Sequence, residues 1–163
     1  MLKIVTIGVY GFTAETFFET LQTAGVQFFC DVRWRRGVRG AAYAFANHKR
    51  LQARLESLGI AYHHRRDLAP TPEIRQRQSD ADRRGRVAKR KRASLSAEFV
   101  SAYQAEILSD FDPHEFIAAL PEGARVVALF CVEREPAACH RSLLAEKLHR
   151  VEGIEVEHLQ PRS

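Results

Sequence analysis

Residues 125–150 read RVVALFCVEREPAACHRSLLAEKLHR, and this stretch decides the fold. The apolar run 126–131 is the clearest strand pattern in the sequence. The leucines at 143, 144 and 148 then mark a helix with a buried face. A buried strand followed by an amphipathic helix is typical of α/β proteins, and the rest of the sequence repeats this order.

Further strands are predicted from short runs rich in β-branched and aromatic residues. These runs are 3–8, 26–32, 60–64 and 153–159. Helices are predicted between them, and candidate N-caps are Thr13, Asn47 and Asp112. Alternating strands and helices favour a three-layer α/β sandwich with a mainly parallel sheet. We predict that residues 1–163 form a single domain, because this length is close to the commonest domain size.

The composition limits the class of protein. Of the 163 residues, 45% are hydrophobic and 28% are charged, as in ordinary globular proteins. No apolar run approaches the roughly 18 residues of a membrane span, and the N-terminus lacks the pattern of a secretory signal. The three cysteines do not have the spacing of a disulfide framework. We therefore expect a cytoplasmic protein with free thiols and no membrane partner.

Positive charge is concentrated in residues 65–93, which we call the basic segment. It contains 11 Lys or Arg and 4 Asp or Glu, whereas the whole chain has a formal net charge of only +5. Pro70, Pro72 and Gly85 interrupt it, and it has few apolar residues. We expect this segment to be mobile unless a partner orders it.

Three segments leave predicted strands at their carboxyl ends. They are residues 8–11, 31–33 and 131–141. The carboxyl ends of parallel strands gather at one edge of a sheet, and ligands bind in the crevice there. We therefore expect these three segments to form the walls of one crevice.

The crevice is predicted to bind an anion. Pro136 suits the first position of a helix, so the residues after it would lie near a helix N-terminus with unpaired N–H groups. Arg33 and Arg141 are predicted to hold the ligand, because a guanidinium group pairs with a carboxylate or phosphate through two hydrogen bonds. Tyr10 is a third predicted substrate-binding residue. The ligand class is a phosphate, a nucleotide or a carboxylate, and no cofactor is predicted.

Four ionisable side chains of the crevice are predicted to be catalytic. Asp31, Glu133 and His140 would carry protons. Cys139 is a candidate nucleophile, because a partly exposed thiol at a helix start beside His140 and Arg141 would have thiolate character. The alternative is structural: the acidic side chains and the arginines would pair with one another and pin the loops together.

A metal site is a further alternative, and the sequence argues against it. Cys131, Cys139 and His140 are possible ligands, but their spacing matches no common zinc motif. Consecutive residues of a helix also point about 100° apart, so Cys139 and His140 would not face one ion. We therefore predict no metal. The glycine pattern of a dinucleotide-binding fold is absent as well.

Five short motifs are spread over nearly the whole chain. They are TIG at 6–8, GVxFFCDVR at 25–33, LxxxLxxxGIxYxH at 51–64, CxExxPxxCHR at 131–141 and EHL at 157–159. This set resembles the DUF488 family of uncharacterised bacterial and archaeal proteins. The resemblance implies a small cytosolic α/β domain, but it implies no particular reaction. The signature polar residues that it implies are Asp31, Arg33, Glu133, His140 and Arg141.

Two functions are predicted from these observations. The first is an enzyme or a ligand-binding protein with an anion site at the carboxyl edge of the sheet. The alternative is a nucleic-acid-binding protein whose basic segment contacts phosphates through Lys89, Arg90, Lys91 and Arg92. Chemistry on a nucleic acid would be compatible with both predictions.

Overall fold

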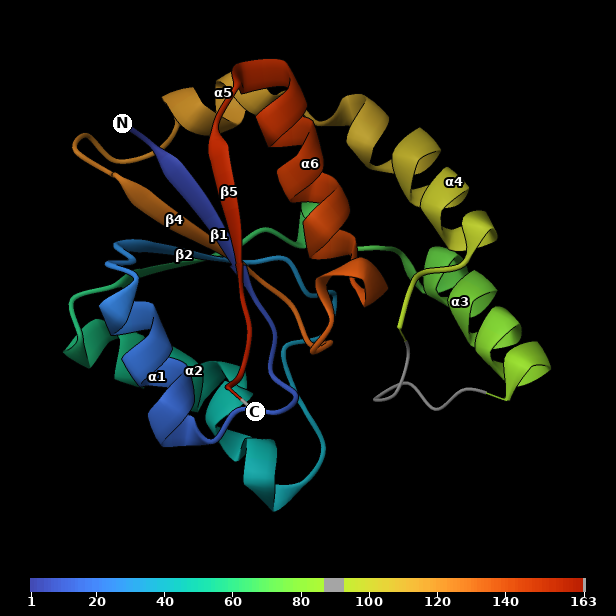
Figure 1. The fold of residues 1–163 in the computed structure, drawn as a ribbon, viewed down its shortest axis with the longest axis horizontal. Coiled ribbons are helices and arrows are strands. Elements are labelled where there is room, and N and C mark those ends of the chain that lie inside the picture. The colour runs from blue at the N-terminus through green and yellow to red at the C-terminus, as the bar shows by residue number, and fades with distance from the viewer. Residues whose placement is uncertain (87–92, 163) are drawn as a thin grey trace.

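The strands form one parallel sheet in the computed structural model of the chain, which describes residues 1–86 and 93–162. The strands are β1 (Lys3–Ile7), β2 (Phe28–Asp31), β3 (Ala61–His64), β4 (Val126–Phe130) and β5 (Glu155–Leu159). Their order across the five-stranded sheet is β3-β2-β4-β1-β5, and all neighbours are parallel (Figure 1). The predicted parallel sheet is confirmed, and each strand lies within a run that the sequence indicated.

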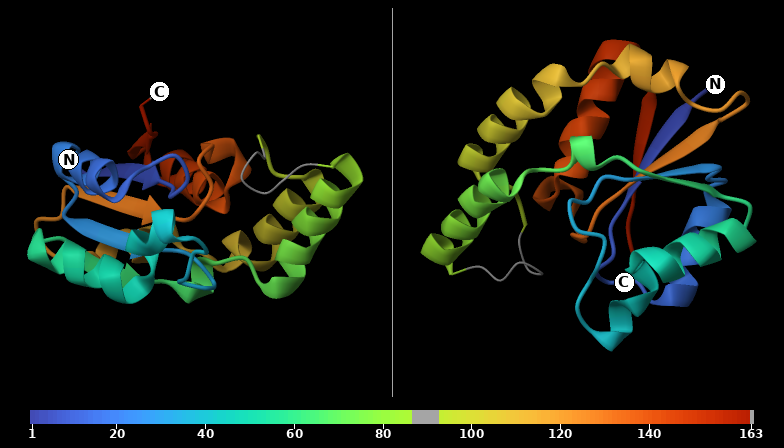
Figure 2. Two further views of the ribbon diagram at one scale, coloured as in Figure 1. Left: turned by 90° about the horizontal axis from the view of Figure 1, so that it is seen from below. Right: turned by 180° about the vertical axis from the view of Figure 1, so that it is seen from behind.

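Helices cover both faces of the sheet. On one face lie α1 (Ala14–Thr23) and α2 (His48–Ser57), and on the other lie α4 (Ala97–Glu106), α5 (Pro113–Ala118) and α6 (His140–Glu152). Figure 2 shows the sheet between these two groups of helices. The predicted α/β sandwich is confirmed. Within the described residues, no helix has the length and apolar character that crossing a membrane requires.

Alternation along the strands supplies both hydrophobic cores. In β1, Ile4 faces the core that contains Leu144 of α6, whereas Val5 faces the core that contains Phe17 of α1. The ring of Phe17 packs edge-on against Phe130 of β4, with ring centroids 5.6 Å apart. Because the central strands are buried on both faces, their sequences are continuously apolar and not alternating.

The helix starts follow the predicted capping residues, with one difference. The hydroxyl of Thr13 accepts a hydrogen bond from the N–H of Thr16 at 3.1 Å, and Asp112 caps α5 in the same manner. Asn47 immediately precedes α2 as predicted, but its side chain does not cap the helix. Its Oδ1 instead accepts a hydrogen bond from the N–H of Val38 at 2.7 Å, because the preceding loop folds back over it.

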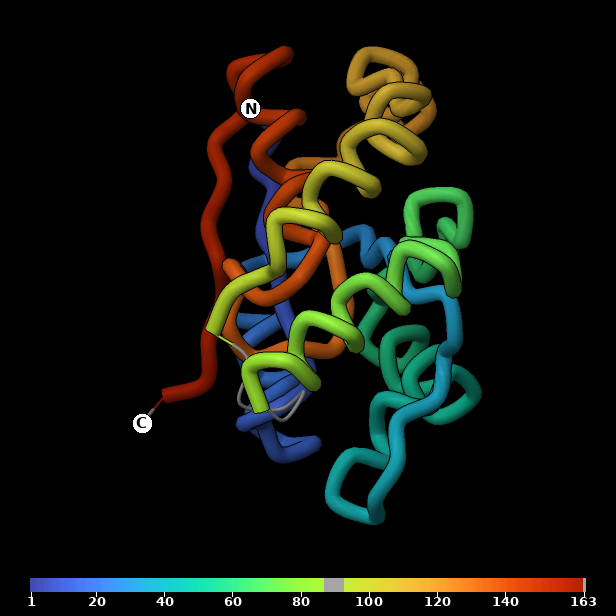
Figure 3. The backbone as a smooth tube through the Cα atoms, turned by 90° about the vertical axis from the view of Figure 1, so that its right-hand side faces the viewer, coloured from blue at the N-terminus to red at the C-terminus, as the bar shows by residue number. Residues whose placement is uncertain are grey.

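Helix α3 (Pro72–Gly85) lies in the basic segment, for which no helix was expected from the sequence. The hydroxyl of Thr71 caps its first turn by accepting from the N–H of Ile74 at 3.3 Å. Ile74 and Gln78 are the buried residues of α3, one turn apart on the same face. Oε1 of Gln78 accepts a hydrogen bond at 2.8 Å from the N–H of Ser96, the N-cap of α4. Figure 3 shows α3 and α4 in front of the sheet when the molecule is viewed from their side.

The backbone at Gly8, just after β1, packs directly against the backbone of Glu133 in the loop after β4. A Cβ atom added to Gly8 would lie 1.9 Å from the carbonyl oxygen of Glu133 and 3.2 Å from Nη1 of Arg141. We expect Gly8→Ala to lower the free energy of unfolding by about 3 kcal/mol, because the main chain itself must shift to make room. Urea denaturation measured side by side with the wild type tests this.

Gly37→Ala is the matched control for that substitution. The atom nearest to an added Cβ at Gly37 is Oδ1 of Asn47 at 3.6 Å, which is an ordinary contact. This variant should remain within about 0.5 kcal/mol of the wild type. Equal losses of stability in the two variants would contradict the steric explanation.

Candidate functional site

The loops after β1, β2 and β4 lie next to one another because β4 lies between the other two strands in the sheet. The N–H of Val9 donates a hydrogen bond to the carbonyl of Val132 at 2.8 Å. On the other side, the N–H of Val32 donates to the carbonyl of Phe130 at 3.0 Å. Main-chain hydrogen bonds therefore hold the three segments together at the carboxyl edge of the sheet.

Asp31 and Arg33 form a buried ion pair where β2 ends. Oδ1 of Asp31 accepts hydrogen bonds from N and Nε of Arg33 at 3.1 and 2.9 Å. Oδ2 accepts from Nη2 of Arg33 at 2.8 Å and from the hydroxyl of Tyr62 at 2.6 Å. The guanidinium also donates to the carbonyl of Ala46 at 2.8 Å and lies over the ring of Phe130. Because each carboxylate oxygen already accepts two hydrogen bonds, this pair anchors the loop after β2.

Tyr62 completes that network from the neighbouring strand β3. Burial raises the pKa of Tyr62 to about 12, and the adjacent Asp31 carboxylate contributes to the rise. The hydroxyl therefore keeps its proton at neutral pH and donates it to Asp31.

Arg141 is a second buried guanidinium, and it holds the main chain of the motif. Its exposed fraction is 0%, and it lies in the first turn of α6. Nη1 donates to the carbonyl of Glu133 at 2.7 Å, and Nη2 donates to the carbonyl of Arg134 at 3.3 Å. Within the described part of the chain, Nε of Arg141 has no hydrogen-bond partner. These contacts tie the loop that leaves β4 to the start of α6.

Two thiols and an imidazole meet beside this loop. We call Cys131, Cys139 and His140 the sulfur–imidazole cluster. Nδ1 of His140 lies 3.7 Å from Sγ of Cys131 and 3.8 Å from Sγ of Cys139. Nε2 of His140 lies 2.8 Å from the carbonyl oxygen of Val32, and it must be the donor because a carbonyl only accepts. In the neutral ring, Nδ1 therefore carries the lone pair and faces both sulfur atoms.

Cys139 reaches the cluster from a position outside the helix. It is the residue before α6, and its backbone is extended, with φ −137° and ψ 142°. The expectation of a partly exposed thiol is wrong, since Cys139 is 1% exposed. The neighbouring imidazole is also buried: the ring of Tyr103 from α4 packs edge-on against His140, which is 4% exposed.

The two thiols of the cluster differ in their acidity. Burial raises the pKa of Cys131 well above its usual value, and the neighbouring Cys139 adds to this rise. Burial acts on Cys139 in the same direction. For Cys139, however, the hydrogen bond with Cys131 and the charges of Arg141 and His140 outweigh burial, and the pKa falls well below its usual value. The two thiols are therefore shifted in opposite directions, and Cys139 is the more acidic of the pair.

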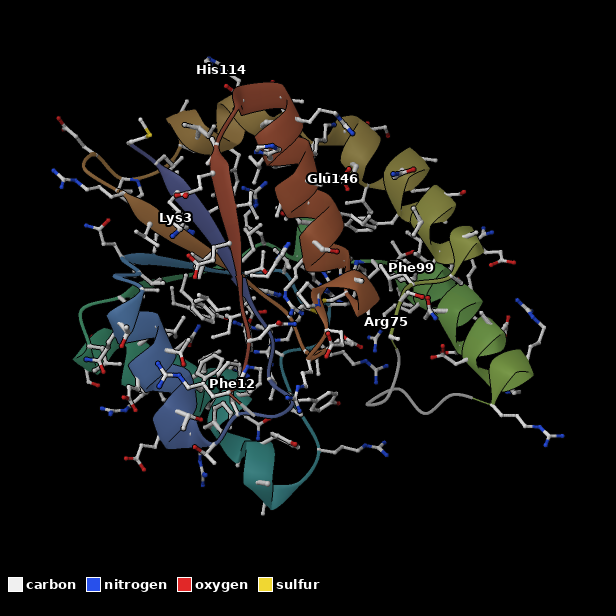
Figure 4. All side chains as sticks on the ribbon, in the orientation of Figure 1. Lys3, Phe12, Arg75, Phe99, His114 and Glu146 are labelled. Carbon is white, nitrogen blue, oxygen red and sulfur yellow. The ribbon has the colours of Figure 1, made fainter. Side chains whose placement is uncertain are left out.

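A cavity of about 670 Å³ reaches the sulfur–imidazole cluster. All three cluster residues line it, together with side chains from the loop after β2 and from α3 and α4. The charged residues in its wall are Arg33, Arg35, Arg39, Arg75 and Glu133. Figure 4 labels Arg75 on α3 and Phe99 on α4, which both belong to this wall. The cavity thus joins a basic wall to a sulfur-containing floor.

A protein-family model matches residues 13–148 of the 163-residue chain, and its description is domain of unknown function DUF488. The match covers most of the chain and includes the CxExxPxxCHR motif. The chain belongs to the DUF488 family. No curated protein and no solved structure shows significant similarity to it.

The cavity of this DUF488 protein contains some of the predicted site residues. Tyr10, Arg33, Glu133, Cys139 and His140 line it. Asp31 and Arg141 are not among the described residues that line the cavity. They lie behind its wall, where Asp31 binds Arg33 and Arg141 binds the carbonyl of Glu133. The predicted nucleic-acid-binding residues lie outside the described residues; they are Lys89, Arg90, Lys91 and Arg92.

Three arginines of the DUF488 cavity were not predicted as site residues. Arg35 and Arg39 come from the loop after β2, and Arg75 comes from the first turns of α3. A signal for the first two is present in the sequence: WRRGVRG at 34–40 contains three arginines, and no acidic residue follows until Glu56. No local pattern distinguishes Arg75 from the other arginines of the basic segment.

The buried pair of this DUF488 protein should dominate the stability of the loop after β2. We expect Asp31→Asn to lower the free energy of unfolding by about 3 kcal/mol, because it leaves the Arg33 guanidinium buried without its counter-charge. Thermal and urea unfolding measure this loss.

Asp67→Asn is the matched control, because Asp67 pairs with Arg65 through the same two-residue spacing. That pair is also bidentate, at 2.9 Å for both contacts, but it is partly exposed to solvent. The control should change stability by less than about 1 kcal/mol. If the two substitutions have similar effects, burial of the Asp31 pair does not explain its contribution.

Proposed function

We propose that the chain binds a small anionic ligand in the cavity and acts on it at the sulfur–imidazole cluster. The observation that supports this is the shared cavity: the arginines and the cluster line one space of about 670 Å³. Small-molecule sites typically occupy about 300–1,000 Å³. The proposed ligand class is a phosphate, a nucleotide or a carboxylate.

The charge of the wall favours an anion. Among the described residues that line the cavity, four are arginines and one, Glu133, is acidic. Guanidinium groups in a partly enclosed space attract and orient anions more strongly than the same groups on an open surface. Arg33 is held by Asp31 and Ala46, so Arg35 and Arg75 are better placed to contact a ligand directly.

The floor of the cavity offers the groups for chemistry. Cys139 is the proposed nucleophile, and Nδ1 of His140 faces its sulfur and is the proposed proton acceptor. The carbonyl of Val32 orients the imidazole from its far side. Glu133 lines the same cavity and is a second proposed proton carrier. We assign Asp31 and Arg141 to positioning, because their hydrogen bonds hold Arg33 and the main chain at Glu133.

Binding of the anion should depend on Arg75. We expect isothermal titration of the chain with inorganic phosphate, AMP and citrate to show saturable binding of at least one of them. Arg75→Ala should weaken that binding by about tenfold or more, since one charge-assisted hydrogen bond contributes about 1.5–3 kcal/mol.

Arg77→Ala is the matched control, because Arg77 is on the same helix but is exposed and does not line the cavity. It removes the same charge and should leave binding within about twofold of the wild type. Absence of saturable binding for all three anions would reject the anion site. Equal weakening by both variants would show that net charge, and not the cavity, is responsible.

A nucleic acid is the second candidate ligand. The observation that favours it is the exposure of Arg77, Arg83 and Arg84 along α3, which projects from the body of the molecule with α4 (Figure 1). Arginines on a projecting helix can neutralise phosphates of a nucleic acid, and such binding weakens steeply as salt rises.

Gel-shift titrations with single- and double-stranded RNA and DNA at two salt concentrations test this candidate. A variant with Lys89, Arg90, Lys91 and Arg92 changed to Ala should lose affinity and show a shallower salt dependence. The control variant carries Arg50→Ala and Arg54→Ala on α2, on the opposite face of the sheet. Undiminished binding by the four-residue variant would exclude that basic run as the contact.

A further inference from the structure

We propose that the sulfur–imidazole cluster is a three-ligand site for a divalent, thiol-preferring metal ion such as Zn²⁺, with a fourth position open to the cavity. This inference concerns the same cavity as the proposed function but changes the roles at its floor, because with a metal bound Cys139 and Nδ1 of His140 are ligands and not nucleophile and proton acceptor. It does not require that function to be correct, since metal binding can be measured without any substrate.

The distances between the ligand atoms fit a single ion. The two sulfur atoms and the ring nitrogen of the cluster all lie within 4.8 Å of one another. Zinc binds sulfur at about 2.3 Å and nitrogen at about 2.0–2.1 Å, so tetrahedral geometry places the nitrogen about 3.6 Å from each sulfur. The observed separations are 3.7 Å to Cys131 and 3.8 Å to Cys139. The side chains therefore need little movement to bind one ion.

The orientation of His140 is also that of a metal ligand. A histidine that binds a metal through one nitrogen usually donates its other N–H to a carbonyl or a carboxylate, which fixes the ring. Nε2 of His140 makes such a hydrogen bond to the carbonyl of Val32 at 2.8 Å. Nδ1 is thereby directed at the two sulfur atoms. The edge of Tyr103 packs on the ring from the side and restricts its rotation.

Cys139 and His140 are not consecutive residues of one helix, so the 100° separation expected from helix geometry does not hold them apart. The structure places Cys139 before the helix in an extended conformation, so its thiol and the following imidazole converge. Cys131 joins them from the end of β4, where its N–H is bound to the carbonyl of Ile7.

The cavity distinguishes this site from a purely structural zinc site. Structural sites are closed by four protein ligands, whereas catalytic sites keep three protein ligands and one exchangeable position. Here three ligands line a cavity that also contains the arginines, so an anion held by that wall can occupy the fourth position. With the metal bound, Nδ1 of His140 is a ligand, and the metal would be the reacting centre. In the metal-free chain, the thiols and the imidazole would be the reacting groups.

The test uses cobalt as a spectroscopic probe. The metal-free chain, prepared under reducing conditions, is titrated with Co²⁺ and then with Zn²⁺. We expect one Co²⁺ per chain, with sulfur-to-cobalt charge-transfer absorption and the intense visible bands of tetrahedral cobalt, both lost on adding Zn²⁺. Absence of these bands in the folded wild-type chain would overturn the proposal.

Variants identify the ligands. Cys139→Ser and His140→Gln should each lower cobalt affinity by at least about 100-fold, because even loss of an outer-shell partner costs about 10–100-fold. Cys30→Ala is the matched control: Cys30 is a buried cysteine of β2 that is not in the cluster, and its loss should leave the bands unchanged. Circular dichroism establishes that each variant is folded. If either cluster variant is unfolded, Cys131→Ser takes its place in the comparison. Unchanged binding by the cluster variants would assign the metal elsewhere and overturn the proposal.

The open position has its own test. Cyanide added to the cobalt-loaded chain should shift the visible bands, because a small anion can enter an exchangeable position. An unchanged spectrum would show a closed site. Failure of the proposed function has a separate signature, since phosphate, AMP and citrate are titrated into the metal-free chain and into the zinc-loaded chain. If the cobalt bands appear but none of the three anions binds to either form, the anion site is rejected and the metal site is retained.

Discussion

The candidate site depends on the buried guanidinium of Arg141. It donates hydrogen bonds to the carbonyls of Glu133 and Arg134 and so fixes the turn between β4 and α6. That turn carries Cys139 and His140 back to Cys131. The Glu133 carbonyl also lies against Gly8, where no side chain would fit, so one contact aligns the exits of β1 and β4. Burial of an ion costs several kcal/mol after relaxation, and only multiple hydrogen bonds in a rigid loop offset this. The rigid turn therefore fixes the positions of Cys139 and His140 relative to Cys131.

The cationic groups near the cavity have two different tasks. Arg33 and Arg141 are buried, and their donors are largely engaged by Asp31 and by carbonyl groups. They shape the loops and supply positive potential, but they do not reach far into the cavity. Arg35, which is exposed, and Arg75, which is half-buried, lie in its wall. A ligand would therefore meet side chains whose positions are set by the loop after β2 and by α3, whereas the motif supplies the floor.

Regular elements with strong apolar patterns could be predicted from the sequence, and elements held by tertiary contacts could not. The strands are short apolar runs, and Thr13 and Asp112 cap helices as their sequence positions indicate. Helix α3 has only Ile74 and Gln78 as buried residues, so its apolar periodicity is too weak to identify. Its buried face is completed by the next helix, α4, across a connection that no periodic pattern predicts. Asn47 illustrates the same limit, because the N–H of Val38, nine residues earlier, competes for its side chain.

The sequence by itself determined the class of fold, the edge of the sheet where the polar segments emerge, and the membership in the DUF488 family. These follow from local composition and from the direction of parallel strands. Only the tertiary structure decided which polar groups line the cavity. Asp31 and Arg141 lie behind the wall, Arg75 enters it from α3, and Cys139 joins Cys131 and His140 although it is buried. The physical reason is that burial and side-chain direction depend on the packing of segments distant in sequence, which no local pattern encodes.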